Sequence, residues 1–224
     1  MIHSSLPFKP ICLLWDVDGT LIDTTSLIIN CLDFIYTKHF KKSITVEERK
    51  ALIGIPLWRQ IRIFGEPEDY GTTEVEVMQD FIAYYESRGD EETILTEVIG
   101  VLRAGKLAGL PTGLVTSKNR PELANSFPRL GITDCVDVVM SADDVVNPKP
   151  APEGILKAME VLGIKSSAAV CYIGDTTHDM RAASSAGVYG IGVTWGAGSA
   201  NRLEEAGAQS IVNTPAELRM LLGL

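Results

Sequence analysis

Residues 15–23 read WDVDGTLID, and this stretch decides the fold because it joins a buried strand to a cluster of acids. The preceding run, ICLLW at 11–15, is apolar, and Asp16, Asp18 and Asp23 follow it within eight positions. Carboxylates repel one another and are costly to bury unpaired. A strand that ends in Asp-Val-Asp therefore predicts a cation nearby.

The composition is that of a globular protein with a small-molecule partner. The chain has 224 residues, 46% of them hydrophobic, and a formal net charge of −9. Nucleic acid is disfavoured as a partner because its phosphates reward clustered Lys and Arg, which this chain lacks. We expect a monomer or a homodimer that acts on a small molecule.

No feature of the sequence indicates a membrane or an oxidising compartment. No apolar stretch approaches the ~20 residues of a spanning helix, and residues 1–10 (MIHSSLPFKP) lack a signal-peptide core. The four cysteines lack zinc-type spacing, so we predict buried, reduced thiols and a cytoplasmic location. They are Cys12, Cys31, Cys135 and Cys171.

Short apolar runs alternate with helical segments along most of the chain. This alternation predicts an α/β fold with a doubly wound, mostly parallel, Rossmann-like sheet. The segment from Pro152 to Gly163 has a typical helix start and end, whereas Pro128 predicts a kink or an early stop in the helix before it. The strand candidates are 11–15, 112–116, 136–140, 169–173 and 190–194.

The stretch 21–93 breaks this alternation, since it contains helical patterns and no strand candidate. One helix in it has a plausible cap at Ser43 or Thr45. We predict a small all-helical cap domain at 21–93, inserted into a core formed by 1–20 and 94–224. The alternative is that these helices pack on the sheet within one domain.

Chemically useful residues follow four of the predicted strands. In open parallel sheets, ligands bind at the carboxyl ends of the strands, so these residues should converge on one edge. Oxygen ligands in this number suit a hard cation, and magnesium takes one or two carboxylates together with substrate phosphate oxygens. The converging residues are Asp16 and Asp18, Thr116 and Ser117, Lys149, and Asp175 and Asp179.

These residues resemble the four motifs of the haloacid dehalogenase-like hydrolase superfamily. The matching segments are DVDGTL at 16–21, Thr116 after its strand, Lys149 in a K-P-x-P context, and GDTTHD at 174–179. Motif order and spacing match from about residue 11 to the end. The combination is specific, although each motif alone is common.

The resemblance implies a role for each matched residue. Asp16 would be the nucleophile that forms an aspartyl-phosphate, and Asp18 would be the general acid and base. Thr116 and Lys149 would hold the phosphoryl oxygens. Mg²⁺ would be bound by Asp16, the main-chain carbonyl of Asp18 and Asp175, with Asp179 close by. Relatives that cleave carbon–halogen bonds lack the second aspartate, so phosphate-ester chemistry is favoured.

The cap segment LIGIPLWRQIRIFG resembles the cap loop of phosphoglycolate phosphatases and of a related pyrophosphatase group. Arg59 or Arg62 is a candidate for binding a substrate carboxylate or second phosphate, or else lies on a solvated helix surface. Lys118 is expected to be a solvated residue at a helix start, with an approach to the phosphate as the alternative. The full set of substrate-binding candidates is Gly19, Thr20, Gly54, Arg59, Arg62 and Ser117.

The sequence therefore predicts a magnesium-dependent phosphatase for a small phosphorylated metabolite such as phosphoglycolate. Three alternatives remain open. One is a phosphosugar mutase of the β-phosphoglucomutase type, and the second is an inorganic pyrophosphatase. The third belongs to another class, a receiver-type signalling domain that accepts a phosphoryl group without hydrolytic turnover.

Overall fold

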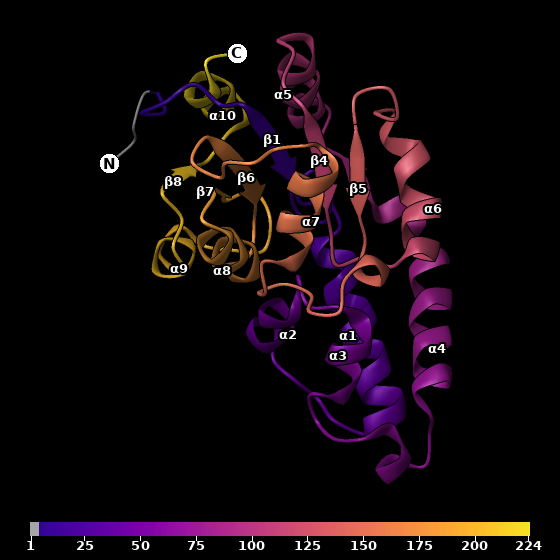
Figure 1. The fold of residues 1–224 in the computed structure, drawn as a ribbon. Helices are drawn as coiled ribbons and strands as arrows, with labels where there is room; N and C mark the ends of the chain where they lie inside the picture. Colours follow the sequence, from indigo (N-terminus) through magenta and orange to yellow (C-terminus); the bar gives the residue numbers. More distant parts are fainter. Residues whose placement is uncertain (1–4) are drawn as a thin grey trace.

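A six-stranded sheet in the order β5-β4-β1-β6-β7-β8, with every neighbouring pair parallel, forms the centre of the upper half of the molecule in Figure 1. The computed structural model describes residues 5–224, and the first four residues of the N-terminal stretch lie outside the described part. This sheet confirms the predicted α/β class. The strands are β1 (Cys12–Trp15), β4 (Thr112–Val115), β5 (Val138–Met140), β6 (Val170–Gly174), β7 (Tyr189–Val193) and β8 (Ser210–Val212).

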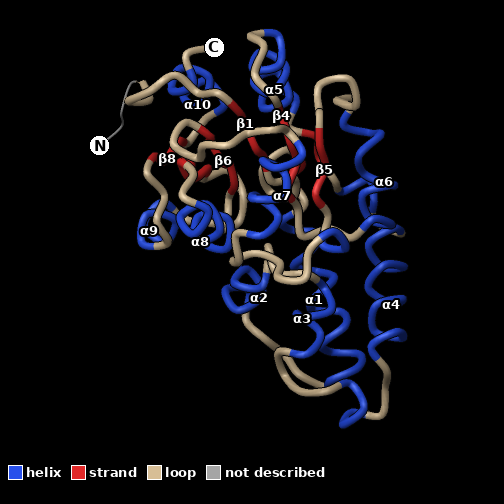
Figure 2. The backbone as a smooth tube through the Cα atoms, viewed as in Figure 1, coloured by secondary structure: helices blue, strands red, loops and turns tan. Residues whose placement is uncertain are grey.

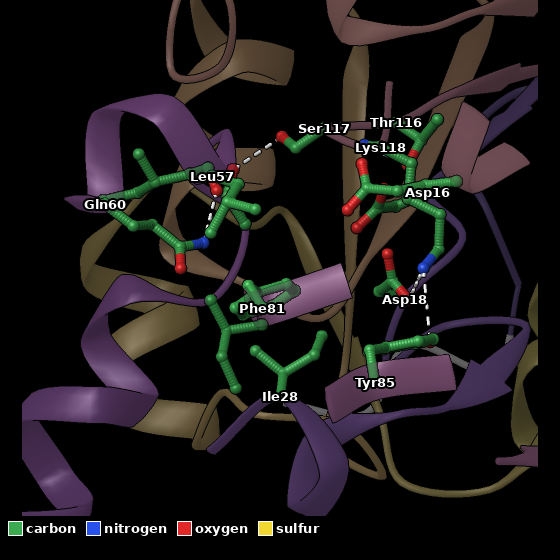
Figure 3. Close-up of a pocket in the computed structure, with 14 residues that line it drawn as sticks. Asp16, Asp18, Ile28, Leu57, Gln60, Phe81, Tyr85, Thr116, Ser117 and Lys118 are labelled. Carbon is green, nitrogen blue, oxygen red and sulfur yellow. Dashed lines mark hydrogen bonds and ion pairs between the residues drawn. The ribbon is translucent and has the colours of Figure 1, made fainter. Parts of the chain in front are cut away.

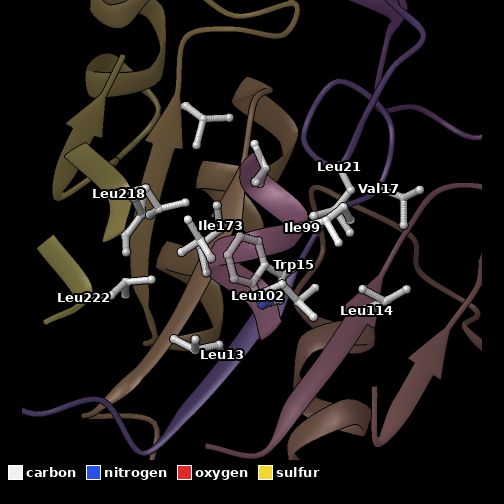
Figure 4. Close-up of a cluster of buried hydrophobic side chains, with 14 of the residues drawn as sticks. Leu13, Trp15, Val17, Leu21, Ile99, Leu102, Leu114, Ile173, Leu218 and Leu222 are labelled. Atoms are coloured by element: carbon white, nitrogen blue, oxygen red, sulfur yellow. The ribbon is translucent and has the colours of Figure 1, made fainter. Parts of the chain in front are cut away.

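Helices cover both faces of the sheet. Successive residues of β1 point to opposite faces, and since these residues are apolar, each face needs a covering layer. Leu13 and Trp15 pack with residues of α5 (Thr96–Leu107) and α10 (Pro215–Leu222), as Figure 4 shows. Cys12 and Leu14 pack on the other face with α7 (Glu153–Val161) and α8 (Thr177–Ala186). Since each fully buried large apolar side chain contributes about 1.5–3 kcal/mol, these two layers hold the strand ends firmly in place.

Two details of the core differ from the sequence-based expectation. The helix α6 (Arg120–Leu130) continues through Pro128, so the predicted early stop is wrong. Only two residues of the helix follow this proline. The strand β8 was not predicted, because three residues at a sheet edge give no periodic signal. The remaining core elements are α9 (Ala200–Glu205) and a 3₁₀ turn at Ala142–Asp144.

Four α-helices follow β1 and form the lower part of the molecule in Figure 1. They enclose a separate apolar cluster that includes Leu32, Ile35, Tyr36 and Ile61. Thr45 caps the second helix through a capping box. Of the two predicted cap residues, Ser43 and Thr45, the second is therefore confirmed. The helices are α1 (Thr25–Phe40), α2 (Val46–Leu52), α3 (Leu57–Arg62) and α4 (Glu74–Glu86), with 3₁₀ turns at Pro67–Tyr70 and Gly89–Glu91.

A short antiparallel ribbon joins this helical region to the sheet. It consists of β2 (Ile22–Asp23) and β3 (Thr93–Ile94), two residues each, which the sequence did not reveal. The ribbon lies at the boundaries predicted for the cap, and Figure 2 shows the helices α1 to α4 grouped away from the strands. The division into two domains at 21–93 stays a prediction.

Two other expectations concern the environment of the chain. The four cysteines are free and buried. Among residues 5–224, no helix has the length and apolar character needed to cross a bilayer. The cytoplasmic location and the monomeric or homodimeric state stay predictions.

Candidate active site

The sheet topology brings the predicted catalytic residues to one edge. β1 lies between β4 and β6. After β1 the chain forms β4 and β5 on one side of it, and later forms β6, β7 and β8 on the other side. Trp15 is in register with Leu114 of β4 and Ile173 of β6, so these three strands end nearly level. Such a switch in strand order leaves a crevice at the carboxyl ends, where ligands bind.

The carboxylate of Asp16 lies in this crevice against a buried lysine. Lys149 Nζ is 2.8 Å from Asp16 Oδ1 and 2.7 Å from Asp179 Oδ1. Asp16 and Lys149 are about 95% buried, and Asp179 is fully buried. Burial alone would favour the neutral amine, but the two carboxylates outweigh it and raise the pKa of Lys149. Lys149 is therefore a fixed positive charge beside the predicted nucleophile.

Asp179 holds this lysine in place. Its Oδ1 accepts hydrogen bonds from Lys149 and from Tyr172 Oη at 3.1 Å, and its Oδ2 accepts from the main chain and hydroxyl of Thr176. Burial raises the pKa of this carboxyl, but Lys149 and the other donors lower it by more. The net effect is a lowered pKa, so Asp179 remains ionised. With both oxygens engaged by the protein, Asp179 is suited to positioning Lys149 more than to direct metal ligation.

Asp175 occupies the third acidic position and contacts the loop after β1. Its Oδ2 accepts from Ala197 N at 2.7 Å, and its Oδ1 accepts from the hydroxyl of Thr20 at 3.2 Å. Gly19 has φ +71°, and a Cβ there would lie 2.2 Å from Asp175 Oδ2. Glycine is thus required at position 19 by both conformation and space, and Gly19 and Thr20 shape the site instead of lining the pocket.

The acidic cluster holds more carboxyl groups than ammonium groups. Oxygens of Asp16, Asp175 and Asp179 lie within 4.8 Å of one another, with Lys149 as their close ammonium partner. Burial, and then the neighbouring carboxylates, raise the pKa of Asp16 to about 7 and that of Asp175 well above its usual range. This donor set fits a hard divalent cation, which would remove the repulsion.

Asp18 points to a different group of partners. Its Oδ1 lies 2.9 Å from Lys118 Nζ and accepts a 2.9 Å hydrogen bond from the hydroxyl of Thr24. The expectation that Lys118 is solvated is wrong, since its side chain is only 6% exposed and lies over the ring of Tyr85 from the cap. The structure thus adds Lys118 and Thr24 to the site, and the side chain of Asp18 is not part of the acidic cluster that could hold a metal.

The helical region covers the site and leaves a small pocket between the helices and the sheet edge (Figure 3). Its cavity of about 50 Å³ holds only a few water molecules. Ser117 Oγ donates a 2.7 Å hydrogen bond to the carbonyl of Gly54, which has φ +88°. The lining residues are Asp16, Asp18, Ile28, Ile53, Gly54, Ile55, Leu57, Gln60, Phe81, Tyr85, Thr116, Ser117, Lys118 and Glu122.

The two candidate arginines are placed elsewhere. Neither lines the pocket: Arg59 stacks on Trp58, and Arg62 pairs with Glu66 and Glu74 on the exposed surface. The neighbouring Gln60 is 6% exposed and lines the pocket instead. Sequence reasoning missed Gln60 because the face of a short helix that turns inward depends on its tertiary contacts.

A family model described as haloacid dehalogenase-like hydrolase matches residues 13–193. The chain belongs to this family. The resemblance drawn from the four motifs and the predicted hydrolase class are therefore confirmed.

Relatives of this family member cover nearly its whole length. It is 34% identical over 223 residues to the protein named "Probable phosphatase IndB" from Dickeya dadantii, covering 94% of this chain and 92% of that one. It is 34% identical over 192 residues to pyrophosphatase PpaX from Bacillus velezensis, covering 82% of each chain. A crystal structure of a hydrolase from Pseudomonas syringae superposes with a TM-score of 0.81 at 20% identity, over 93% of this chain and 95% of that one, and shows the fold.

Proposed function

We propose that this hydrolase is a magnesium-dependent phosphatase that cleaves a small phosphate monoester through an aspartyl-phosphate on Asp16. The observation that carries the proposal is the arrangement around Asp16 Oδ1. Lys149 Nζ lies 2.8 Å from this atom, and one oxygen each of Asp16, Asp175 and Asp179 lie within 4.8 Å of one another, while the next acid, Asp18, belongs to a separate group.

The metal would be held by the carboxylates of Asp16 and Asp175 and by the main-chain carbonyl of Asp18. When bound, Mg²⁺ supplies positive charge that neutralises phosphoryl oxygens. The fit is supported by the excess of buried carboxylates over ammonium groups and by the raised pKa values of Asp16 and Asp175. Asp179 would contribute through Lys149, which it contacts at 2.7 Å.

The side chains suit a two-step displacement. Asp16 attacks phosphorus and takes the phosphoryl group, while Lys149 and the hydroxyl of Thr116 hold the oxygens that carry the developing charge. Asp18 gives a proton to the leaving oxygen and then takes one from the water that hydrolyses the aspartyl-phosphate. Asp18 lines the same pocket as Asp16 but stands outside the acidic cluster, with Lys118 and Thr24 holding its Oδ1 in place.

The relative named pyrophosphatase PpaX favours a second candidate, hydrolysis of inorganic pyrophosphate. The same nucleophile would serve, with phosphate as the leaving group. A phosphosugar mutase would also form the aspartyl-phosphate but return the group to the substrate. The absence of Arg59 and Arg62 from the pocket lining weakens the case for anionic leaving groups.

The proposal is tested by phosphate release from phosphoglycolate, pyrophosphate, glucose 1-phosphate and acetyl phosphate, with Mg²⁺ and with EDTA. We expect many turnovers on at least one monoester, and loss of turnover in EDTA. A single equivalent accepted from acetyl phosphate without further release would refute hydrolysis and favour a phosphoacceptor domain. Isomer formation from glucose 1-phosphate without phosphate release would favour a mutase.

A further inference from the structure

Gln60 lines the pocket and carries a buried hydrogen-bond acceptor, Oε1, that no group in the described part of the chain uses. Its side-chain Nε2 donates a 2.6 Å hydrogen bond to the carbonyl of Ile55, and its main-chain carbonyl accepts a 2.6 Å hydrogen bond from Tyr36 Oη. The first of these bonds fixes the amide orientation, because only the NH₂ group can donate to a carbonyl. Oε1 is therefore the free atom, and it has no hydrogen-bond partner among the described residues.

A buried acceptor without a partner is costly, at about 1–3 kcal/mol, and calls for an explanation. Four buried side-chain atoms of the described residues lack a partner, and Gln60 is the one of these residues that lines the active-site pocket. Figure 3 shows Gln60 and Asp16 on opposite sides of this pocket. A leaving group attached to a phosphoryl group at Asp16 would extend toward Gln60. The other three atoms belong to Trp15, Thr25 and His178.

The rest of the lining disfavours a charged leaving group. The cap contributes apolar side chains, among them Ile28, Leu57 and Phe81, and no Lys or Arg. The charged lining residues are three acids, Asp16, Asp18 and Glu122, and one cation, Lys118, which is already paired with Asp18 at 2.9 Å. A carboxylate or second phosphate would enter a space without a free cation, next to acidic groups.

We infer that Gln60 is a specificity-determining residue that accepts a hydrogen bond from a hydroxyl group of an uncharged leaving group. The substrates are then phosphate monoesters of small polyols or sugars, in preference to carboxylated or diphosphate compounds. This inference rests on the proposed phosphatase function. It narrows that function by requiring two properties of the leaving group, a hydroxyl donor and no charge.

The first test uses the wild-type protein with matched ester pairs. Glycerol 3-phosphate is compared with n-propyl phosphate, and 2-hydroxyethyl phosphate with ethyl phosphate, with phosphoglycolate as the charged analogue. We expect kcat/KM to be about tenfold or more higher for the hydroxylated member of at least one pair, and higher than for phosphoglycolate. Equal values within both pairs, or a preference for phosphoglycolate, would overturn the inference.

The second test separates recognition from a structural role of the same side chain. Gln60→Met removes both the acceptor and the donor to Ile55, whereas Gln60→Lys removes the acceptor and keeps a donor. Both variants should reduce the hydroxyl preference to within about twofold, and Gln60→Lys should also raise kcat/KM for phosphoglycolate. Retention of the preference in Gln60→Lys would show that only the contact with Ile55 matters, and would overturn the inference.

The matched control is Gln79→Met, an identical change at an exposed position of α4. It should leave every substrate ratio unchanged. Failure of the inference and failure of the proposed function have different outcomes. Phosphate release from p-nitrophenyl phosphate without any hydroxyl preference refutes the inference alone, whereas no release from any ester with Mg²⁺ refutes both.

Discussion

The two sides of the active-site pocket are built on opposite principles. On the sheet side, the polar atoms contact one another, and Asp179 alone accepts four hydrogen bonds from Lys149, Tyr172 and Thr176. On the cap side, apolar side chains surround one acceptor of Gln60 that has no partner. On the proposed function, the phosphoryl site would be preorganised by the protein, while the leaving-group site would be completed by the substrate.

The largest expected effect comes from the sheet side. Asp16→Asn should reduce turnover at least about 10³-fold because the amide is a poor nucleophile. Steady-state phosphate release measures this loss. Asp23→Asn, at an exposed acid of the same segment, is the control and should keep near wild-type activity. More than a few per cent of the wild-type rate in Asp16→Asn would remove Asp16 from the nucleophile role.

A change at Asp18 should depend on the leaving group. Asp18→Asn removes the proton donor, so hydrolysis of alkyl phosphates should fall about 10²–10⁴-fold. Hydrolysis of p-nitrophenyl phosphate should fall much less, because its leaving group needs no proton. Comparing kcat/KM for the two ester types measures the difference. Equal losses on both would mean that Asp18 acts through its contact with Lys118 and not as an acid.

Metal binding should depend on pH through the acidic cluster. Burial and Asp179 raise the pKa of Asp16 from 3.8 to about 7, so the metal-free folded protein keeps a proton that the unfolded chain releases. The free energy of unfolding without metal should therefore decrease as pH rises from about 4 to 7. If Mg²⁺ binds the carboxylate of Asp16, as proposed, it would displace this proton, and its apparent affinity should weaken about tenfold per pH unit below 7.

Thermal unfolding with and without Mg²⁺ at pH 5.5 and pH 8 measures this effect. We expect a larger Mg²⁺-induced increase in Tm at pH 8. The control is Asp16→Asn, in which the difference between the two pH values should shrink. The same increase in Tm at both pH values would place the metal away from Asp16.

The smallest effect is expected outside the pocket. Arg62→Ala should change kcat/KM by less than about twofold for every substrate, since this side chain pairs with Glu66 and Glu74 on the cap surface. The same steady-state assays measure it. A selective loss with phosphoglycolate or pyrophosphate would show that Arg62 reaches the substrate when the cap moves, and would weaken the contrast between the two sides.

The sequence was sufficient to predict which residues gather on the sheet side, because a residue that directly follows a parallel strand lies at the carboxyl edge of the sheet. Asp16 and Asp175 come at the ends of apolar runs, and the parallel register brings their carboxylates together. Thr116, at the end of another run, lines the pocket with Asp16. The cap side was not predictable in this way. Lys118 looked solvated because nothing local shows that Tyr85, 33 positions earlier, covers it.

The same limitation explains the arginines and the glutamine. Arg59, Gln60 and Arg62 are neighbours on a six-residue helix, and the tertiary packing of Tyr36 and Ile55 determines that Gln60 turns inward. Helical spacing alone allows any of the three to face the substrate. The short strands β2 and β8 were missed because two or three residues carry no periodicity.

The ribbon of β2 and β3 links the position of Asp18 to that of the cap. Asp18 forms a bridge with Ile22 of the ribbon, and Gly19 N donates a 2.7 Å hydrogen bond to the carbonyl of the same residue. Thr24, between the ribbon and α1, donates to Asp18 itself. Any displacement of the helices at this ribbon would therefore also displace the carboxylate of Asp18. If Asp18 is the proton donor, as proposed, proton transfer would be coupled to the position of the helices over the site.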